Sequence, residues 1–178
     1  LAHHDSMTGL PNRSQLYASL SRALARAKRS GGKVALMLCD LDHFKEINDR
    51  YGHDAGDQVI VEAAERIKFC VRASDLVARL AGDEFTVVME EVRDPEDTLQ
   101  VAQKITAALS APFELSGGHQ GMIGISIGIA LYPDDAMTMN ELLKYADVAM
   151  YRVKERGRGN YCLYADQYGQ NRQDDQER

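Results

Sequence analysis

Apolar residues along this chain follow two different periods. Four segments have apolar residues at intervals of three or four, which is typical of amphipathic helices. These segments cover about residues 13–29, 59–71, 95–109 and 142–153. Short apolar runs predict strands over residues 34–39, 76–80, 85–89, 113–115, 122–131 and 161–164. Every residue of the first run is apolar, as expected for a strand that is covered on both faces.

Two connections between the predicted strands are short enough to be hairpin turns. Residues 81–84 would join the second and third strands, and residues 116–118 would pair the strand 113–115 with the strand 122–131. Helices and strands are thus interleaved, with hairpins among them. This order indicates an α+β sandwich, with a central, mainly antiparallel sheet flanked by helices.

The length and hydropathy favour a single domain outside the membrane. A chain of 178 residues can bury its own core, and we expect one domain over residues 1–167 followed by a polar tail or linker over residues 168–178. The longest apolar run has six residues, too few to span a bilayer, and no secretory signal opens the chain. We expect this domain to be cytoplasmic, although a full-length protein could be anchored to a membrane.

Charge and cysteine content narrow the possible partners. Twenty-one Lys and Arg against 27 Asp and Glu give a net charge of −6, which argues against a nucleic-acid polymer as partner. A small phosphate ligand stays compatible with this charge, because a bound metal ion can supply positive charge. The three cysteines, Cys39, Cys70 and Cys162, suit neither a zinc site nor a disulfide framework, and we expect mostly buried thiols.

Acidic residues gather at the ends of two predicted strands. Asp40 and Asp42 alternate at the end of the first strand, so they should point to one face. Asp83 and Glu84 lie in the hairpin turn. If that hairpin lies beside the first strand, the carboxylates meet at one edge of the sheet and suit Mg²⁺, which prefers oxygen ligands. The alternative is two solvated turns, because Asp is a common turn residue.

Five ordered segments resemble the sequence motifs of the GGDEF family, the diguanylate cyclases. They are residues 5–13 (DSMTGLPNR), 40–49 (DLDHFKEIND), 51–57 (YGHDAGD), 81–85 (AGDEF) and 154–160 (KERGRGN). One departure concerns the signature, which has Ala81 in place of its first glycine. A residue with a Cβ would be strained there if the turn required a positive φ, at a cost of about 1–2 kcal/mol. The last motif has one extra residue before Asn160.

The resemblance implies a fold and a reaction. The family's fold is a palm-like sandwich akin to nucleotide cyclases and polymerases, in agreement with the pattern of strands and helices. The implied reaction joins two GTP into cyclic di-GMP and releases two pyrophosphates, with Mg²⁺ as cofactor and Mn²⁺ as a possible substitute. Each subunit holds one GTP, so a homodimer is needed. Cyclic di-GMP is also expected to bind as an inhibitor.

The resemblance also assigns roles to single residues. Asp40, the carbonyl of Leu41, Asp83 and Glu84 are the implied metal ligands, and Asp83 and Glu84 the implied catalytic residues; Glu84 either holds a second metal or assists deprotonation of the attacking hydroxyl. The implied substrate-binding residues are Asn48 and Asp57 for guanine, Lys45, Lys154 and Arg158 for phosphates, and Gly82 of the signature. As alternatives, Asn48 and Asp57 could be helix caps, and Lys154 and Arg158 favourable charges at a helix C-terminus.

An inhibitory site is implied by a second motif. Arg72 and Asp75 form the family's Arg-x-x-Asp at its usual distance of five residues before the signature, and Arg79 could add a second guanidinium. The alternative is an ordinary charged turn. The alternative function is regulatory: a catalytically impaired GGDEF domain would bind GTP or cyclic di-GMP without turning GTP over. We expect the chain to be part of a larger signalling protein, fused to sensor or phosphodiesterase domains.

Overall fold

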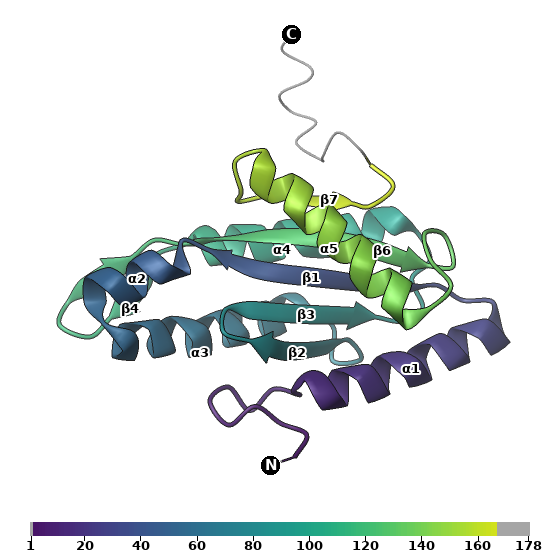
Figure 1. Ribbon diagram of the computed structural model, residues 1–178, viewed down its shortest axis with the longest axis horizontal. Coiled ribbons are helices and arrows are strands. Elements are labelled where there is room, and N and C mark those ends of the chain that lie inside the picture. The colour runs from purple at the N-terminus through teal and green to yellow at the C-terminus, as the bar shows by residue number, and fades with distance from the viewer. Residues whose placement is uncertain (1, 167–178) are drawn as a thin grey trace, which may run out of the picture.

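The computed structural model describes residues 2–166, and the predicted tail over residues 168–178 lies outside the described residues (Figure 1). The helices are α1 (Arg13–Ser30), α2 (Phe44–Tyr51), α3 (His53–Cys70), α4 (Pro95–Ser110) and α5 (Met139–Glu155). The strands are β1 (Val34–Asp42), β2 (Leu76–Ala81), β3 (Glu84–Met89), β4 (Phe113–Leu115), β5 (His119–Gly121), β6 (Gly124–Tyr132) and β7 (Tyr161–Leu163). Among the described residues, no helix is both long and apolar enough to cross a membrane.

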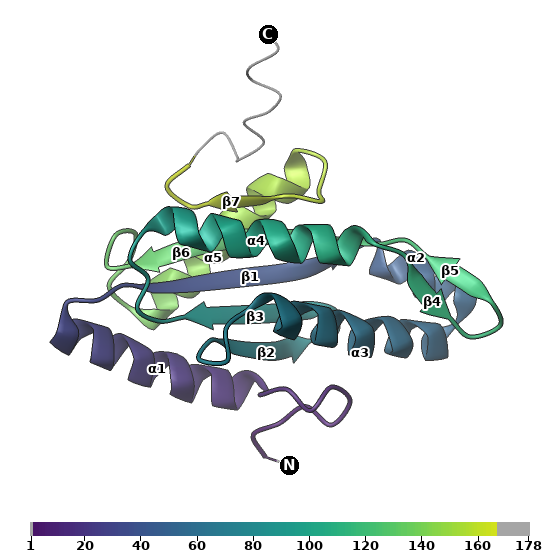
Figure 2. The same cartoon turned by 180° about the vertical axis from the view of Figure 1, so that it is seen from behind.

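A five-stranded sheet forms the centre of the fold. Its order is β2-β3-β1-β6-β7, with antiparallel neighbours except for the parallel pair β6 and β7. Helices α1 and α5 lie on one face, and α3 and α4 cover the other, as the two opposite views show (Figures 1 and 2). The predicted α+β sandwich with a mainly antiparallel sheet is therefore confirmed.

Strand β1 is buried on both faces, which explains its unbroken apolar run. Ala35, Met37, Cys39 and Leu41 pack into the core under α3 and α4. Val34, Leu36 and Leu38 alternate with them and pack into the core under α1 and α5. By this alternation, Asp40 and Asp42 continue the face that α5 covers. Cys39 and Cys162 are buried, and Cys70 is partly buried.

The ends of the helices follow from local side-chain chemistry. Asn12, Asp94 and Thr138 precede α1, α4 and α5, and each side chain accepts a hydrogen bond from a backbone N–H of the first turn. Gly31 ends α1 with a φ of 76°, a conformation that glycine adopts without strain. The caps of α1 and α4 lie where the sequence pattern predicts these helices to begin, whereas α5 begins three residues earlier than predicted, at Met139.

One predicted strand pairing is wrong. Strand β4 pairs with the three-residue strand β5, in a separate two-stranded sheet, and not with residues 122–131. Most of those residues belong to β6, which begins at Gly124 and pairs with the whole of β1, from Val34 opposite Tyr132 to Asp42 opposite Gly124. The long strand buries more apolar surface beside β1 than it could beside β4. The short helix α2 was also not predicted, because Ile47 is its only buried residue.

Helix α5 lies directly on the sheet at a glycine. A Cβ on Gly128 of β6 would lie 2.1 Å from the carbonyl oxygen of Ala146 and 2.2 Å from the backbone nitrogen of Met150. Only a glycine leaves room for such a backbone contact. This contact places the last turn of α5 over the end of β1, next to the acidic residues.

Candidate active site

The carboxyl end of β1 and the β2–β3 hairpin meet at one place, which we call the acidic edge (Asp40, Leu41, Asp83 and Glu84). Asp40 and Glu84 are paired in the antiparallel register, so their side chains leave the sheet on the same face. The backbone N–H of Leu41 donates to the carbonyl oxygen of Asp83 at 3.1 Å. The structure therefore brings together all four residues predicted to bind metal.

Asp83 ionises beside the negative charge of Asp40 at the acidic edge. Oδ1 of Asp40 is buried and has no hydrogen-bond partner among the described residues, whereas Oδ2 pairs with Nζ of Lys154. Burial, and then the negative charge of Asp40, raise the pKa of Asp83 to about 6. A buried carboxylate oxygen without a partner is costly, and a cation beside it would remove that cost.

The acidic edge fits a metal ion that is shared with a phosphate ligand. Within residues 2–166, no three His, Cys, Asp or Glu side chains converge as a ready-made metal cage. Mg²⁺ is commonly held by one or two carboxylates, with water and substrate phosphates as its other ligands. Asp40, Asp83 and the carbonyl of Leu41 match this smaller set of ligands.

Ala81 is accommodated without backbone strain. Ala81 ends β2 and pairs with Glu84 of β3, so the turn of the hairpin has only two residues, Gly82 and Asp83. The predicted turn over residues 81–84 is therefore two residues too long. Gly82 has the positive φ of this turn, 48°, and the non-glycine residues described with a positive φ are His43, Glu91 and Arg158. The strain that a Cβ at the first signature position could cause is absent.

Arg79 fastens the hairpin to the N-terminal loop. Its Nε donates to the carbonyl oxygen of Gly82 at 3.0 Å, and its Nη1 donates to both carboxylate oxygens of Asp5 at 3.1 and 3.2 Å. Asp5 in turn accepts hydrogen bonds from the backbone and the hydroxyl of Thr8. The guanidinium of Arg79 was predicted to join Arg72 at an inhibitory site. In the structure it is hydrogen-bonded to Gly82 of the signature hairpin and to Asp5.

The predicted guanine-reading residue Asn48 lies on α2 against the backbone of α3, at the residue before Asp57. A Cβ on Gly56 would lie 1.8 Å from Oδ1 of Asn48, so the amide of Asn48 rests directly on the backbone next to Asp57. Neither residue caps a helix: Asn48 is inside α2, and α3 begins at His53 after Gly52. The alternative interpretation of both residues as caps is therefore wrong.

Of the three predicted phosphate contacts, Lys154 reaches the acidic edge and Arg158 lies next to Asp42, two residues further along β1. Lys154, in the last turn of α5, pairs with Asp40, and Nη1 of Arg158 lies 3.8 Å from Oδ1 of Asp42. Lys154 also fits the alternative of a favourable charge at a helix C-terminus, because the same position in the last turn suits that role and a phosphate contact. Lys45 is exposed in the first turn of α2, directly after β1.

Sequence reasoning assigned no role to Gly56 and expected Asp42 to join the carboxylates at the sheet edge. Gly56 is buried inside α3, and a glycine in the middle of a predicted helix is a signal of a close approach. Asp42 is instead 2% exposed and accepts hydrogen bonds from Ser126 and Gly159, and burial of this kind cannot be read from the sequence.

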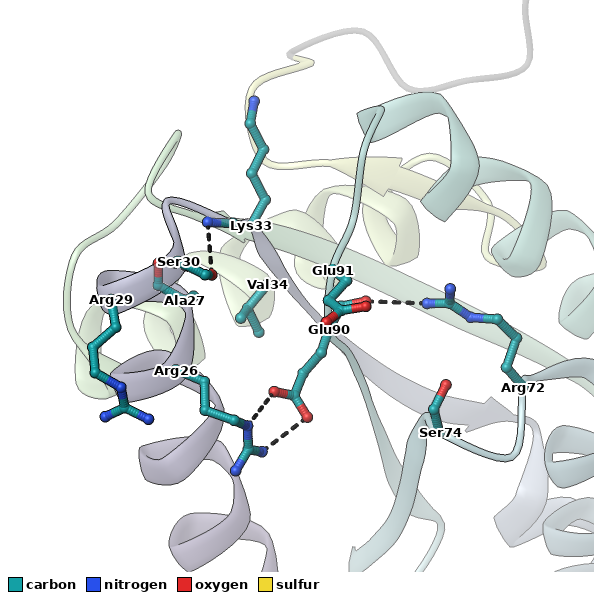
Figure 3. A pocket seen from close by; sticks show the side chains of 11 residues that line it. Arg26, Ala27, Arg29, Ser30, Lys33, Val34, Arg72, Ser74, Glu90 and Glu91 are labelled. Carbon is teal, nitrogen blue, oxygen red and sulfur yellow. Dashed lines mark hydrogen bonds and ion pairs between the residues drawn. The ribbon is translucent and has the colours of Figure 1, made fainter.

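The predicted inhibitory residues lie at the other end of the sheet. Arg72 donates from its backbone and guanidinium to the buried carboxylate of Asp75, and from Nη2 to the carbonyl oxygen of Glu90 at 3.1 Å. Arg72 lines an open pocket of about 530 Å³ together with Arg26 and Lys33 (Figure 3). Because this pocket lies near the start of β1, it is about 20 Å from the acidic edge.

Comparison with known proteins places this geometry in a family. Residues 2–160 match the family model described as "Diguanylate cyclase, GGDEF domain". The chain is 45% identical over 174 residues to the bifunctional diguanylate cyclase/cyclic di-GMP phosphodiesterase MucR of Pseudomonas aeruginosa. This match covers 98% of the chain and 25% of MucR. It is 49% identical over 162 residues to the diguanylate cyclase TpbB of the same species, covering 91% of this chain and 37% of TpbB.

Solved structures agree with these matches. The GGDEF domain of TpbB superimposes with a TM-score of 0.89 at 48% identity, covering 91% of this chain and 94% of that one. The GGDEF domain of DgcB from Caulobacter crescentus, solved in complex with c-di-GMP, gives a TM-score of 0.86 at 29% identity, covering 93% and 98%. The fold, the family match over nearly the whole described chain and these likenesses lead to one conclusion: the chain belongs to the GGDEF family of diguanylate cyclases.

Proposed function

We propose that this chain is an active diguanylate cyclase domain that condenses two GTP into cyclic di-GMP. The observation that carries the proposal is the buried Oδ1 of Asp40, which lies near Asp83 and has no hydrogen-bond partner within residues 2–166, together with Lys154, which pairs with the other oxygen of Asp40. Two carboxylates that repel each other suit a divalent cation, and the nearby ammonium suits a phosphate. In a family of nucleotide-condensing enzymes, this arrangement favours binding of a metal–triphosphate.

The proposed reaction is an attack of a ribose 3′-hydroxyl on the α-phosphate of a second GTP. The new bond joins the 3′-oxygen to the α-phosphorus, the bond from this phosphorus to the β-phosphate oxygen breaks, and pyrophosphate leaves. Two such steps, in a homodimer with one GTP on each subunit, close the ring and release two pyrophosphates. The proton of each hydroxyl passes to a carboxylate or to water.

Each side chain at the acidic edge has a proposed task. Asp40, the carbonyl of Leu41 and Asp83 would hold Mg²⁺ or Mn²⁺, which would offset charge on the attacking and leaving oxygens. Glu84, opposite Asp40, either joins these ligands or accepts the hydroxyl proton. Lys45, Lys154 and Arg158 neutralise the phosphates, and Gly82 lets the hairpin backbone approach them without a side chain in the way.

The experiment that tests this function is turnover by the purified chain. Incubation with GTP and Mg²⁺ should yield cyclic di-GMP and pyrophosphate in a ratio of one to two, and removal of the metal by a chelator should stop the reaction. Binding of GTP without any product would instead support the second candidate, a regulatory module that binds nucleotide. The observation in favour of this second candidate is Ala81 at the first signature position.

Replacement of Ala81 by glycine should change turnover by less than about threefold. Ala81 has no positive φ, so the alanine is not strained and glycine relieves nothing in the backbone. Steady-state rates of the two proteins, measured side by side with GTP and Mg²⁺, check this expectation. A gain of tenfold or more would mean that the methyl group obstructs the substrate.

We also propose that cyclic di-GMP binds at Arg72 and inhibits the domain. Arg72→Ala should weaken cyclic di-GMP binding by at least about tenfold, since loss of a charge-assisted hydrogen bond has about that effect. Binding of GTP should stay nearly unchanged, because the acidic edge is at the other end of β1. Titration calorimetry with each nucleotide provides the measurement, and equal cyclic di-GMP affinities would contradict the proposal.

A further inference from the structure

Asp42 is a buried carboxylate whose partners lie on distant segments. Its Oδ1 accepts a hydrogen bond from the hydroxyl of Ser126 at 2.7 Å, and its Oδ2 accepts one from the backbone N–H of Gly159 at 2.8 Å. Nη1 of Arg158 lies 3.8 Å from Oδ1. The carboxylate is thus the link between the end of β1 and the loop that follows α5.

That loop has an unusual backbone. Gly157, Arg158 and Gly159 have φ values of 111°, 65° and 60°, so three consecutive residues lie in the region that favours glycine. An arginine with a positive φ is uncommon, and such a conformation persists only where the surroundings hold it. The N–H of Arg158 donates to the carbonyl oxygen of Val153, and the carboxylate of Asp42 holds the next residue.

The opposite strand leaves room for this contact. Gly124 of β6 is paired with Asp42 in the register. A Cβ on Gly124 would lie 3.1 Å from Oδ2 of Asp42 and 3.8 Å from Cα of Gly159. The absence of a side chain at this position lets the loop approach the carboxylate.

We propose that Asp42 is a positioning residue that holds the loop of Arg158 and Gly159 so that the guanidinium of Arg158 is presented to the phosphates of GTP. The inference rests on the proposed function, because it assumes that Arg158 contacts phosphate. Asp42 acts through the loop and does not touch the substrate. Its carboxylate is buried, whereas the side chain of Arg158 is 43% exposed and free to meet a ligand.

The test compares how strongly each variant prefers a triphosphate to a monophosphate. The probes are 3′-deoxy-GTP, which lacks the attacking hydroxyl, and GMP, both with Mg²⁺ and measured by calorimetry. Asp42→Asn removes the charge opposite Arg158 and should lower the ratio of the two affinities by about tenfold. Arg158→Ala should lower this affinity ratio to a similar degree. The double variant with both changes should lower the ratio little further, because the effects of substitutions at coupled residues are not additive.

Two further variants separate positioning from general stability. Ser126→Ala removes the hydrogen bond to Oδ1 of Asp42 but leaves the bond to Gly159, so it should lower the melting temperature and largely keep the affinity ratio. Gly124→Ala should push the carboxylate away from Gly159 and lower the ratio while Asp42 is intact.

The outcomes distinguish this inference from the proposed function. A reduced ratio in Arg158→Ala with an unchanged ratio in Asp42→Asn and Gly124→Ala would overturn the positioning role. An unchanged ratio in Arg158→Ala, in a chain that still makes cyclic di-GMP, would also overturn it and leave the proposed function standing. A chain that binds no 3′-deoxy-GTP would refute the proposed function itself.

Discussion

Replacement of Asp83 by asparagine should lower the rate of cyclic di-GMP formation by at least about 10³-fold. The acidic edge offers few ligands, so loss of one carboxylate leaves the metal–triphosphate poorly held, and metal contributions to catalysis amount to several kcal/mol. Asp40→Asn should have an effect of the same size. Product is measured by chromatography after incubation with GTP and Mg²⁺.

The Asp83→Asn variant should not be destabilised in the absence of metal. The charge of Asp40 opposes ionisation of Asp83, so a neutral amide at position 83 removes a repulsion from the folded state and leaves the ion pair of Asp40 with Lys154 in place. We expect the melting temperature of metal-free Asp83→Asn at neutral pH to equal or exceed that of the parent. An activity loss together with retained stability separates a functional role from a structural one.

A matched control for these variants is Asp147→Asn, on the exposed side of α5. It removes the same charge from an exposed side chain about two helical turns before Lys154 and should keep full turnover. Undiminished product formation by Asp83→Asn or Asp40→Asn would contradict the metal assignment, whatever the control shows.

Replacement of Gly56 by alanine should narrow the preference for GTP over ATP by at least about tenfold. The new Cβ would lie 1.8 Å from Oδ1 of Asn48, so the amide must leave its place against the backbone of α3. Sites that recognise a ligand by polar pairing can prefer it over an analogue by up to about 10⁴–10⁵-fold. Because Asp57 is exposed, we expect a smaller preference for GTP over ATP here. Competition between the two nucleotides, measured as relative affinities, gives the answer.

The fold should survive this change. Alanine is the better helix former by about 1 kcal/mol, and the displaced atoms belong to a side chain and not to the backbone. Asn48→Ala should narrow the preference to a similar degree, and Gly56→Ala added to it should have little further effect on the preference. A full additional loss would show that Gly56 acts by some route other than Asn48.

Asp57→Asn provides an independent test of guanine reading. A carboxylate can accept from both N1–H and the 2-amino group of guanine, whereas the carboxamide can accept only one of them. The variant should therefore bind GTP more weakly and ATP no worse. Equal affinities of the unmodified chain for GTP and ATP would refute the role of both residues.

The sequence by itself determined most of the elements and the residue types of the site. The apolar spacing predicts a helix over residues 13–29, and α1 spans Arg13–Ser30. The unbroken apolar run predicts that β1 is covered on both faces, as the two cores on either side of it confirm. Such features depend on side-chain periodicity and caps, which are local properties of the chain.

Only the tertiary structure decided the pairings. Strand β6 pairs with β1 and not with β4, which makes Val34 and Tyr132 neighbours in the sheet although they are far apart in sequence. The strain expected at Ala81 is absent, because the register of β2 and β3 gives the positive φ to Gly82. Contacts between distant segments also decide three features of the site that no local pattern encodes. These are the buried oxygen of Asp40, which has no partner in the described part of the chain, the contact of the Asn48 amide with Gly56, and the hydrogen bond from Gly159 to Asp42.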